Sequence, residues 1–112
     1  MKSLAAAVLL AAAIPAAGAL AATPTTAVGN VKTGKSLFKL HDCGSCHLMA
    51  AANALDGSGA GPDLDTTRKT YAQIVANITN GGKHMTGYKK VLTTVQIQDL
   101  AAFIYKSAQT QQ

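Results

Sequence analysis

The stretch that decides the fold of this chain is Cys43-Gly44-Ser45-Cys46-His47. Two cysteines three positions apart, followed directly by a histidine, form the sequence pattern of covalent c-type haem attachment. Each thiol adds to one haem vinyl group, so both sulfurs must reach neighbouring edges of one ring. Gly44 and Ser45 are small enough to let the loop lie close to that ring, and His47 then offers an imidazole nitrogen to the iron. The stretch therefore predicts one haem c, bound through Cys43 and Cys46.

Three other interpretations of the cysteine pair compete with haem attachment. A thioredoxin-type redox pair expects a βαβ context, and no convincing strand pattern surrounds these cysteines. A zinc site needs two further ligands at knuckle spacing, and the sequence does not supply them. A simple disulfide is the third alternative. Features elsewhere in the chain favour the haem.

The N-terminal residues 1–21 are predicted to form a secretory signal peptide. Lys2 gives a charged start, an Ala/Leu/Val run covers Leu4 to Ile14, and Ala19-Leu20-Ala21 fits a small-x-small cleavage site. The apolar run is short and alanine-rich for a membrane span, although an uncleaved anchor helix is the alternative. Export indicates a bacterial periplasm as the destination, with no stable membrane insertion of the mature chain.

The rest of the chain divides into a flexible leader at 22–30, one domain at 31–108 and a flexible tail at 109–112. Helical patterns cover 34–40 and 71–80, and the second of these should end at Gly81-Gly82. A last helix is expected to begin at a capping box formed by Thr93 and Gln96 and to run to about Ala108. Residues 48–55 suggest a short helix and 56–62 a loop. The predicted fold class is all-α.

The mature domain, about 90 residues long, is small for a self-sufficient core. It has no tryptophan, two phenylalanines and three tyrosines. A haem would add the missing apolar bulk, so the cofactor is expected to be structural as well as functional. The formal charge is +5, one of which leaves with Lys2. Arg68 is the only arginine, so a nucleic-acid partner is not indicated, whereas acidic protein partners are compatible with this charge.

The second axial ligand of the iron is predicted from the loop after Gly81-Gly82. Met85 lies 38 residues after His47, and a thioether opposite a histidine raises the reduction potential. Met49 is too close to His47 to reach the opposite face. His84 is an alternative that would give a bis-histidine centre, His41 lies too close before the attachment stretch, and an open site is the third possibility.

With these residues in place, the chain resembles the class I c-type cytochromes, specifically the small bacterial monohaem members. The resemblance covers about Gly34 to Tyr105 and implies a cytochrome c fold, with three to five helices wrapped around one covalently attached haem. Two residue pairs, Gly34 with Phe38 and Leu100 with Phe103, match the family's first and last helices. In the family these helices cross at near right angles, which would explain a glycine within a helix.

The resemblance also implies a pocket around the iron ligand. The Gly61-Pro62-Asp63-Leu64 turn resembles one in which the proline carbonyl accepts the Nδ1 proton of the ligating histidine, so Pro62 would support His47. Met85 and Tyr88 resemble the family's Met-Pro-x-aromatic signature. Here Thr86-Gly87 stands where proline is usual, so the loop is expected to be looser and the methionine–iron bond more easily displaced.

The predicted function is that of a monomeric, periplasmic single-electron carrier with His/Met ligation, without enzymatic activity of its own. Redox proteins with acidic docking surfaces are the expected partners, steered by Lys39, Lys83, Lys89 and Lys90. Ordinary solvated lysines are an equal alternative for this set. The competing functions are a cytochrome subunit of a dehydrogenase or oxidase, for example in sulfur oxidation, and a ligand-binding haem protein with a labile distal site.

Overall fold

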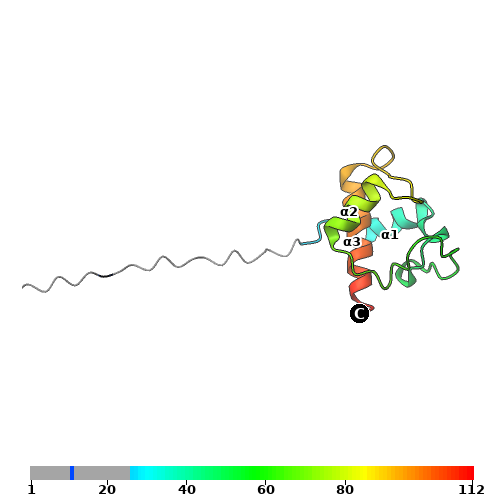
Figure 1. The fold of residues 1–112 in the computed structure, drawn as a ribbon, viewed down its shortest axis with the longest axis horizontal. Coiled ribbons are helices and arrows are strands. Elements are labelled where there is room, and N and C mark those ends of the chain that lie inside the picture. The colour runs from blue at the N-terminus through cyan, green and yellow to red at the C-terminus, as the bar shows by residue number, and fades with distance from the viewer. Residues whose placement is uncertain (1–10, 12–25) are drawn as a thin grey trace, which may run out of the picture.

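The structure is a computed structural model that describes residue 11 and residues 26–112. The predicted signal peptide and the start of the leader therefore lie, apart from residue 11, outside the described residues. The described residues form three helices: α1 (Val31–Leu40), α2 (Tyr71–Asn80) and α3 (Thr94–Gln109). Two single 3₁₀ turns, η1 (Cys43–Ser45) and η2 (Ala50–Ala52), lie between α1 and α2 (Figure 1).

The all-α prediction is confirmed. Extended pairing in the described part is limited to two isolated bridges, Met49 with Ala54 and Gly81 with Thr86. The expected short helix within 48–55 is the η2 turn. In residues 26–112, no helix combines the length and the apolar character needed to cross a membrane.

Each helix begins at a side chain that caps its free backbone N–H groups. The Asn30 side chain accepts from the N–H of Thr33 at the start of α1. Capping boxes start the other two helices, Thr70 with Gln73 for α2 and, as predicted, Thr93 with Gln96 for α3. Helix α2 ends at Gly81, whose φ of 72° is readily adopted only by glycine.

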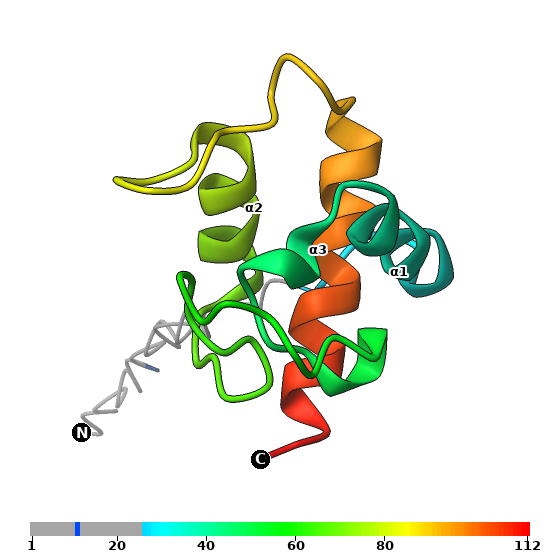
Figure 2. The same ribbon diagram turned by 90° about the vertical axis from the view of Figure 1, so that its right-hand side faces the viewer.

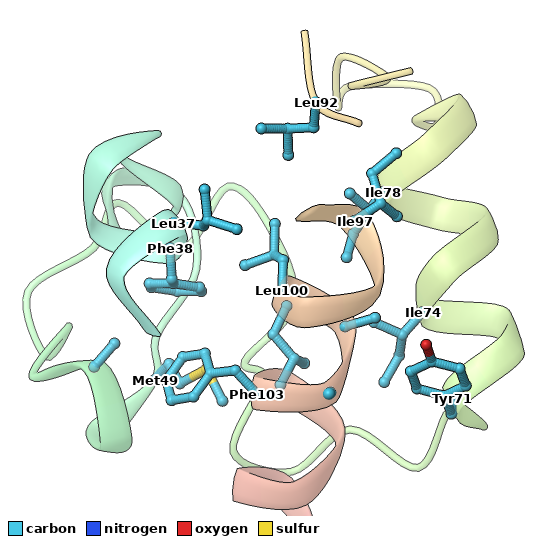
Figure 3. Packing of buried hydrophobic residues seen from close by; sticks show 14 residues of the cluster. Leu37, Phe38, Met49, Tyr71, Ile74, Ile78, Leu92, Ile97, Leu100 and Phe103 are labelled. Atoms are coloured by element: carbon cyan, nitrogen blue, oxygen red, sulfur yellow. The ribbon is translucent and has the colours of Figure 1, made fainter. Parts of the chain in front are cut away.

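Helix α3 is the centre of the fold and packs on α1 and α2 (Figure 2). Leu37 and Phe38 of α1 meet it from one side, while Ile74 and Ile78 of α2 meet it from the other (Figure 3). The rings of Phe38 and Phe103 pack edge to face, with centroids 5.8 Å apart. The largest fully buried side chains are Phe38, Met49, Leu100 and Phe103.

Gly34 lies where α1 approaches α3 most closely. A Cβ atom at this position would overlap the backbone carbonyl of Asp99 and lie 2.7 Å from Cβ of Phe103. Only glycine lets the two helix backbones come this near.

Residues on both sides of the predicted domain at 31–108 contact its body. Ala27 packs against the core, and the carbonyl of Val28 accepts from the Tyr71 hydroxyl at 2.6 Å. The N–H of Asn30 donates to the buried Asp99 carboxylate at 2.7 Å. At the other end, the Gln112 side-chain amide donates to the carbonyl of Thr67 at 2.9 Å.

Candidate haem-binding site

The Cys43–His47 loop follows directly from the C-terminus of α1. His41 caps the helix and Asp42 turns the chain with a φ of 54°. The η1 turn then brings the N–H of His47 to the carbonyl of Cys43 at 3.0 Å. Cys43 is half-buried, Cys46 is exposed, and no disulfide joins them. The tight turn places both thiols and the imidazole within one short loop.

The environment of Cys43 is unlike that of a redox-active thiol. Burial raises its pKa to about 11, and the charges of Asp42 and Cys46 add to the effect. Catalytic cysteines of disulfide oxidoreductases instead have lowered thiol pKa values, because the thiolate is the nucleophile. A raised thiol pKa at Cys43 is therefore not what the thioredoxin-type interpretation of the pair expects.

His47 is oriented by a backbone carbonyl. Its Nδ1 lies 2.7 Å from the carbonyl oxygen of Pro62. A carbonyl oxygen only accepts, so Nδ1 carries the proton and the lone pair is left on Nε2. A metal-ligating histidine is typically held in this way, with its second nitrogen donating to a carbonyl or carboxylate. The arrangement leaves Nε2 as the nitrogen that would bind iron.

Gly61 makes room for the His47 ring. A Cβ at Gly61 would lie 2.6 Å from Nδ1 and 2.9 Å from Nε2 of His47, so the backbone of Gly61 lies against the ring. Such a cradle, which any other side chain would fill, fixes the plane of the imidazole. Together with two thiols not paired in a disulfide, it fits a covalently attached haem with His47 as axial ligand.

The loop that carries Gly61 and Pro62 runs alongside the Cys43–His47 loop. Backbone hydrogen bonds join Ser58 to Ser45 at 2.9 Å, Gly61 to Cys46 at 3.0 Å and Leu64 to Leu48 at 3.0 Å. Leu64 is half-buried against the core. The pairing ties the His47 support to the loop that carries the cysteines.

Met85 lies in the loop after α2, which carries the second predicted ligand. Met85 is half-buried, whereas the neighbouring His84 is exposed. The loop bends back on itself through a 2.9 Å hydrogen bond from the N–H of Gly82 to the carbonyl of Met85. It is then tied to α2 by bonds from Tyr88 to Ile78 and from Lys89 to Thr79. This differs from the loose loop expected from Thr86-Gly87.

Tyr88 brings the Met85 loop to the Cys43–His47 loop. Its ring packs edge to face on His41, with centroids 5.9 Å apart. Burial raises the pKa of the Tyr88 phenol, and the nearby Cys43 and Cys46 thiols and the Asp42 carboxylate raise it further. His41 is half-buried in this contact. Nothing in the sequence pairs His41 with a residue so distant along the chain.

Other features that could have contributed to the haem site lie apart from His47 and Met85. Met49 is fully buried among the core residues around Phe103 (Figure 3). A cavity of about 330 Å³ lies beside the Cys43–His47 loop and is lined by Phe38, Lys39, Asn53 and Asp56 among others, but by neither His47 nor Met85. Within residues 26–112, no three His, Cys, Asp or Glu side chains gather as a metal site of protein ligands requires.

Comparison with known proteins gives results consistent with this geometry. Residues 29–104 match the protein-family model described as cytochrome C oxidase, cbb3-type, subunit III. A cytochrome c6-like protein of Nostoc sp. is 32% identical over a 93-residue alignment, which covers 78% of this chain and 79% of that protein. Cytochrome c6 of Synechocystis sp. is 32% identical over 76% of this chain and 72% of that protein.

One solved structure is similar in both fold and sequence. The crystal structure of the c-type cytochrome SorU from Sinorhizobium meliloti aligns with a TM-score of 0.63 and 27% sequence identity. The alignment covers 70% of this chain and 90% of that one.

Proposed function

This chain belongs to the class I c-type cytochromes and is a haem-based electron-transfer protein, and we propose that it works as a periplasmic single-electron carrier with His47 and Met85 as axial ligands. The single observation that carries the proposal is the His47 site, in which Pro62 fixes the Nδ1 proton and Gly61 leaves room for the ring. The haem iron supplies the one-electron change between its ferric and ferrous states.

The residues of the chain divide the work of holding that group. Cys43 and Cys46 form the two thioether links, one half-buried and one exposed. His47 presents Nε2 to the iron, because Nδ1 donates to Pro62. The carbonyl of Pro62 accepts a hydrogen bond from Nδ1, which makes the imidazole more basic and so a stronger ligand. Leu64 and Tyr88, both packed against the core, are proposed as apolar walls of the pocket.

Met85 is the proposed ligand on the other side of the iron. Its side chain is half-buried although the neighbouring Lys83, His84 and Thr86 are exposed. Methionines commonly fill gaps in hydrophobic cores, and a position between exposed polar residues is an unusual place for that role. Tyr88 connects the Met85 loop to the Cys43–His47 loop. His84 is the weaker candidate, because its side chain is exposed.

Exposed lysines are proposed to guide partners to this end of the molecule. Lys39 lies at the end of α1, and Lys89 and Lys90 follow Tyr88. Opposite charges on a partner would speed the encounter and make its rate depend on salt. We propose that the mature chain is a monomer, exported to the periplasm after removal of residues 1–21.

The test is the optical spectrum of the purified holoprotein and of two variants. Wild-type protein should keep its haem after denaturation and, when oxidised, show the weak methionine–iron charge-transfer band in the red. The Met85→Leu variant should lose that band and lower the reduction potential, since thioether sulfur favours ferrous iron. The control, His84→Leu, should keep both. A band that survives in Met85→Leu, or disappears in His84→Leu, would show that the second ligand is another residue.

A second function is favoured by the matching family, whose description is that of an oxidase subunit. Leu40 and Val91 are 76% and 63% exposed, respectively, close in sequence to the proposed lysines. Exposed apolar side chains suit a permanent contact with a larger catalytic chain. Co-purification of such a chain with a tagged protein from its own cells would support the subunit function. Isolation as a monomer would support the diffusible carrier.

A further inference from the structure

We infer that Gly81 and Gly87 are positioning residues for Met85. They let residues 81–88, the Met85 hairpin, fold tightly against the end of α2 and so fix the methionine without the proline that usually follows it. The inference rests on the proposed ligation by Met85. The hairpin extends beyond the end of α2 and returns to it (Figure 2).

Gly81 forms the first side of the hairpin. Its φ of 72° lies in the left-handed region, where an L side chain is strained. A Cβ there would also overlap the carbonyl of Met85 and lie 2.5 Å from the nitrogen of Gly87. The bridge between Gly81 and Thr86 forms only because this position carries no side chain.

Gly87 forms the returning side. A Cβ at Gly87 would lie 2.6 Å from the carbonyl carbon of Asn80 and 2.8 Å from the carbonyl oxygen of Thr79. Both atoms belong to the backbone of the last turn of α2, so no side-chain rotation can relieve the overlap. A larger residue at Gly87 must therefore push the hairpin away from α2 and carry Met85 with it.

Hydrogen bonds hold the hairpin closed and anchor it to the core. The N–H of Gly82 donates to the carbonyl of Met85 at 2.9 Å, which fixes the backbone of the proposed ligand itself. The N–H of Tyr88 donates to the carbonyl of Ile78 at 2.8 Å, and the Ile78 side chain is only 3% exposed. Movement of Met85 thus requires either opening of the hairpin or displacement of a core helix.

Gly82 provides a matched control within the same hairpin. A Cβ at Gly82 would have no atom within 4 Å, and its φ lies outside the left-handed region. Alanine at this position adds the same methyl group, at nearly the same distance along the chain from Met85, without the collision. The two substitutions differ mainly in whether the added methyl group would overlap the backbone of α2.

The experiment compares Gly87→Ala and Gly82→Ala as holoproteins. Gly82→Ala should keep the methionine–iron band and the wild-type rate of carbon monoxide binding to the reduced protein. Gly87→Ala should lose most of the band and bind carbon monoxide at least about tenfold faster, because the collision displaces the ligand. Helix content should stay unchanged in both variants, which separates positioning from a general loss of fold. Equal bands and equal rates in the two variants would overturn the inference.

Hydrogen exchange keeps the inference testable if Gly87→Ala does not fold. In the reduced wild-type holoprotein, the amides of Gly82 and Tyr88 should exchange much more slowly than those of the exposed Lys83 and His84. Equal exchange at all four would show that the hairpin is open, and would overturn the inference. A wild-type protein without the red band but with slow exchange would instead refute His/Met ligation and leave the hairpin in place.

Discussion

Replacing Gly34 by alanine sets two physical effects against each other. In an exposed helix position, alanine would stabilise the chain by about 1 kcal/mol relative to glycine. Here the added methyl group would overlap the carbonyl of Asp99 and lie 2.7 Å from Cβ of Phe103. Overpacking a core site costs about 1–3 kcal/mol. The upper end applies, because Asp99 contributes backbone atoms that move only if α3 moves.

The expected result is a net loss of about 2 kcal/mol in the free energy of unfolding, the overpacking cost less the gain in helix propensity. For a domain of this size, the loss corresponds to a fall in Tm of about 8–16 °C. The assay is denaturant and thermal unfolding of the holoprotein, followed by helix circular dichroism. Lys35→Ala, at the exposed neighbouring position, is the control and should change stability by less than about 0.5 kcal/mol. A Gly34→Ala protein as stable as wild type, or more stable, would refute the close crossing of α1 and α3.

Two further pairs of substitutions test contacts that the structure shows elsewhere. Asp99→Ala should cost about 1–3 kcal/mol in unfolding free energy, because Asp99 accepts the N–H of Asn30 at the start of α1; Asp99→Asn, which keeps an acceptor, should cost less, and equal losses would contradict this role. Gly61→Ala should alter the Soret band, because its Cβ would displace the His47 ring. Pro62→Ala keeps the main-chain carbonyl that His47 uses and should change the spectrum little; the opposite order of effects would contradict the cradle.

Local patterns in the sequence were sufficient to predict the helices. The capping residues of α3 and the glycine that ends α2 act within one turn of chain, so their signals are readable without any tertiary contact. The contacts of Val28 and Asn30 were not predictable, because their partners, Tyr71 and Asp99, lie far away in the sequence. Composition alone marked that stretch as flexible.

The candidate site was predictable to different depths on its two sides. Cys43, Cys46 and His47 form one short motif, and their spacing alone predicts haem attachment. The close packing of the Met85 loop against α2 was not predictable, since a glycine such as Gly87 by itself indicates flexibility. The contacts of Gly87 with Thr79 and Asn80 make it a tight packing site instead. A glycine can make a loop flexible or allow it to pack tightly, and only its neighbours in space distinguish the two cases.

The sequence by itself determined the cofactor class and the helical fold, and it predicted the attachment residues, because each depends on residues close together along the chain. Tertiary structure decided how His47 is oriented, how closely α1 and α3 approach, and how firmly Met85 is held. These properties depend on backbone atoms of Pro62, Asp99 and Asn80 that meet distant partners. Every residue has a main-chain carbonyl. No sequence pattern therefore marks the few carbonyls that accept a hydrogen bond from a histidine or that leave no room for a methyl group.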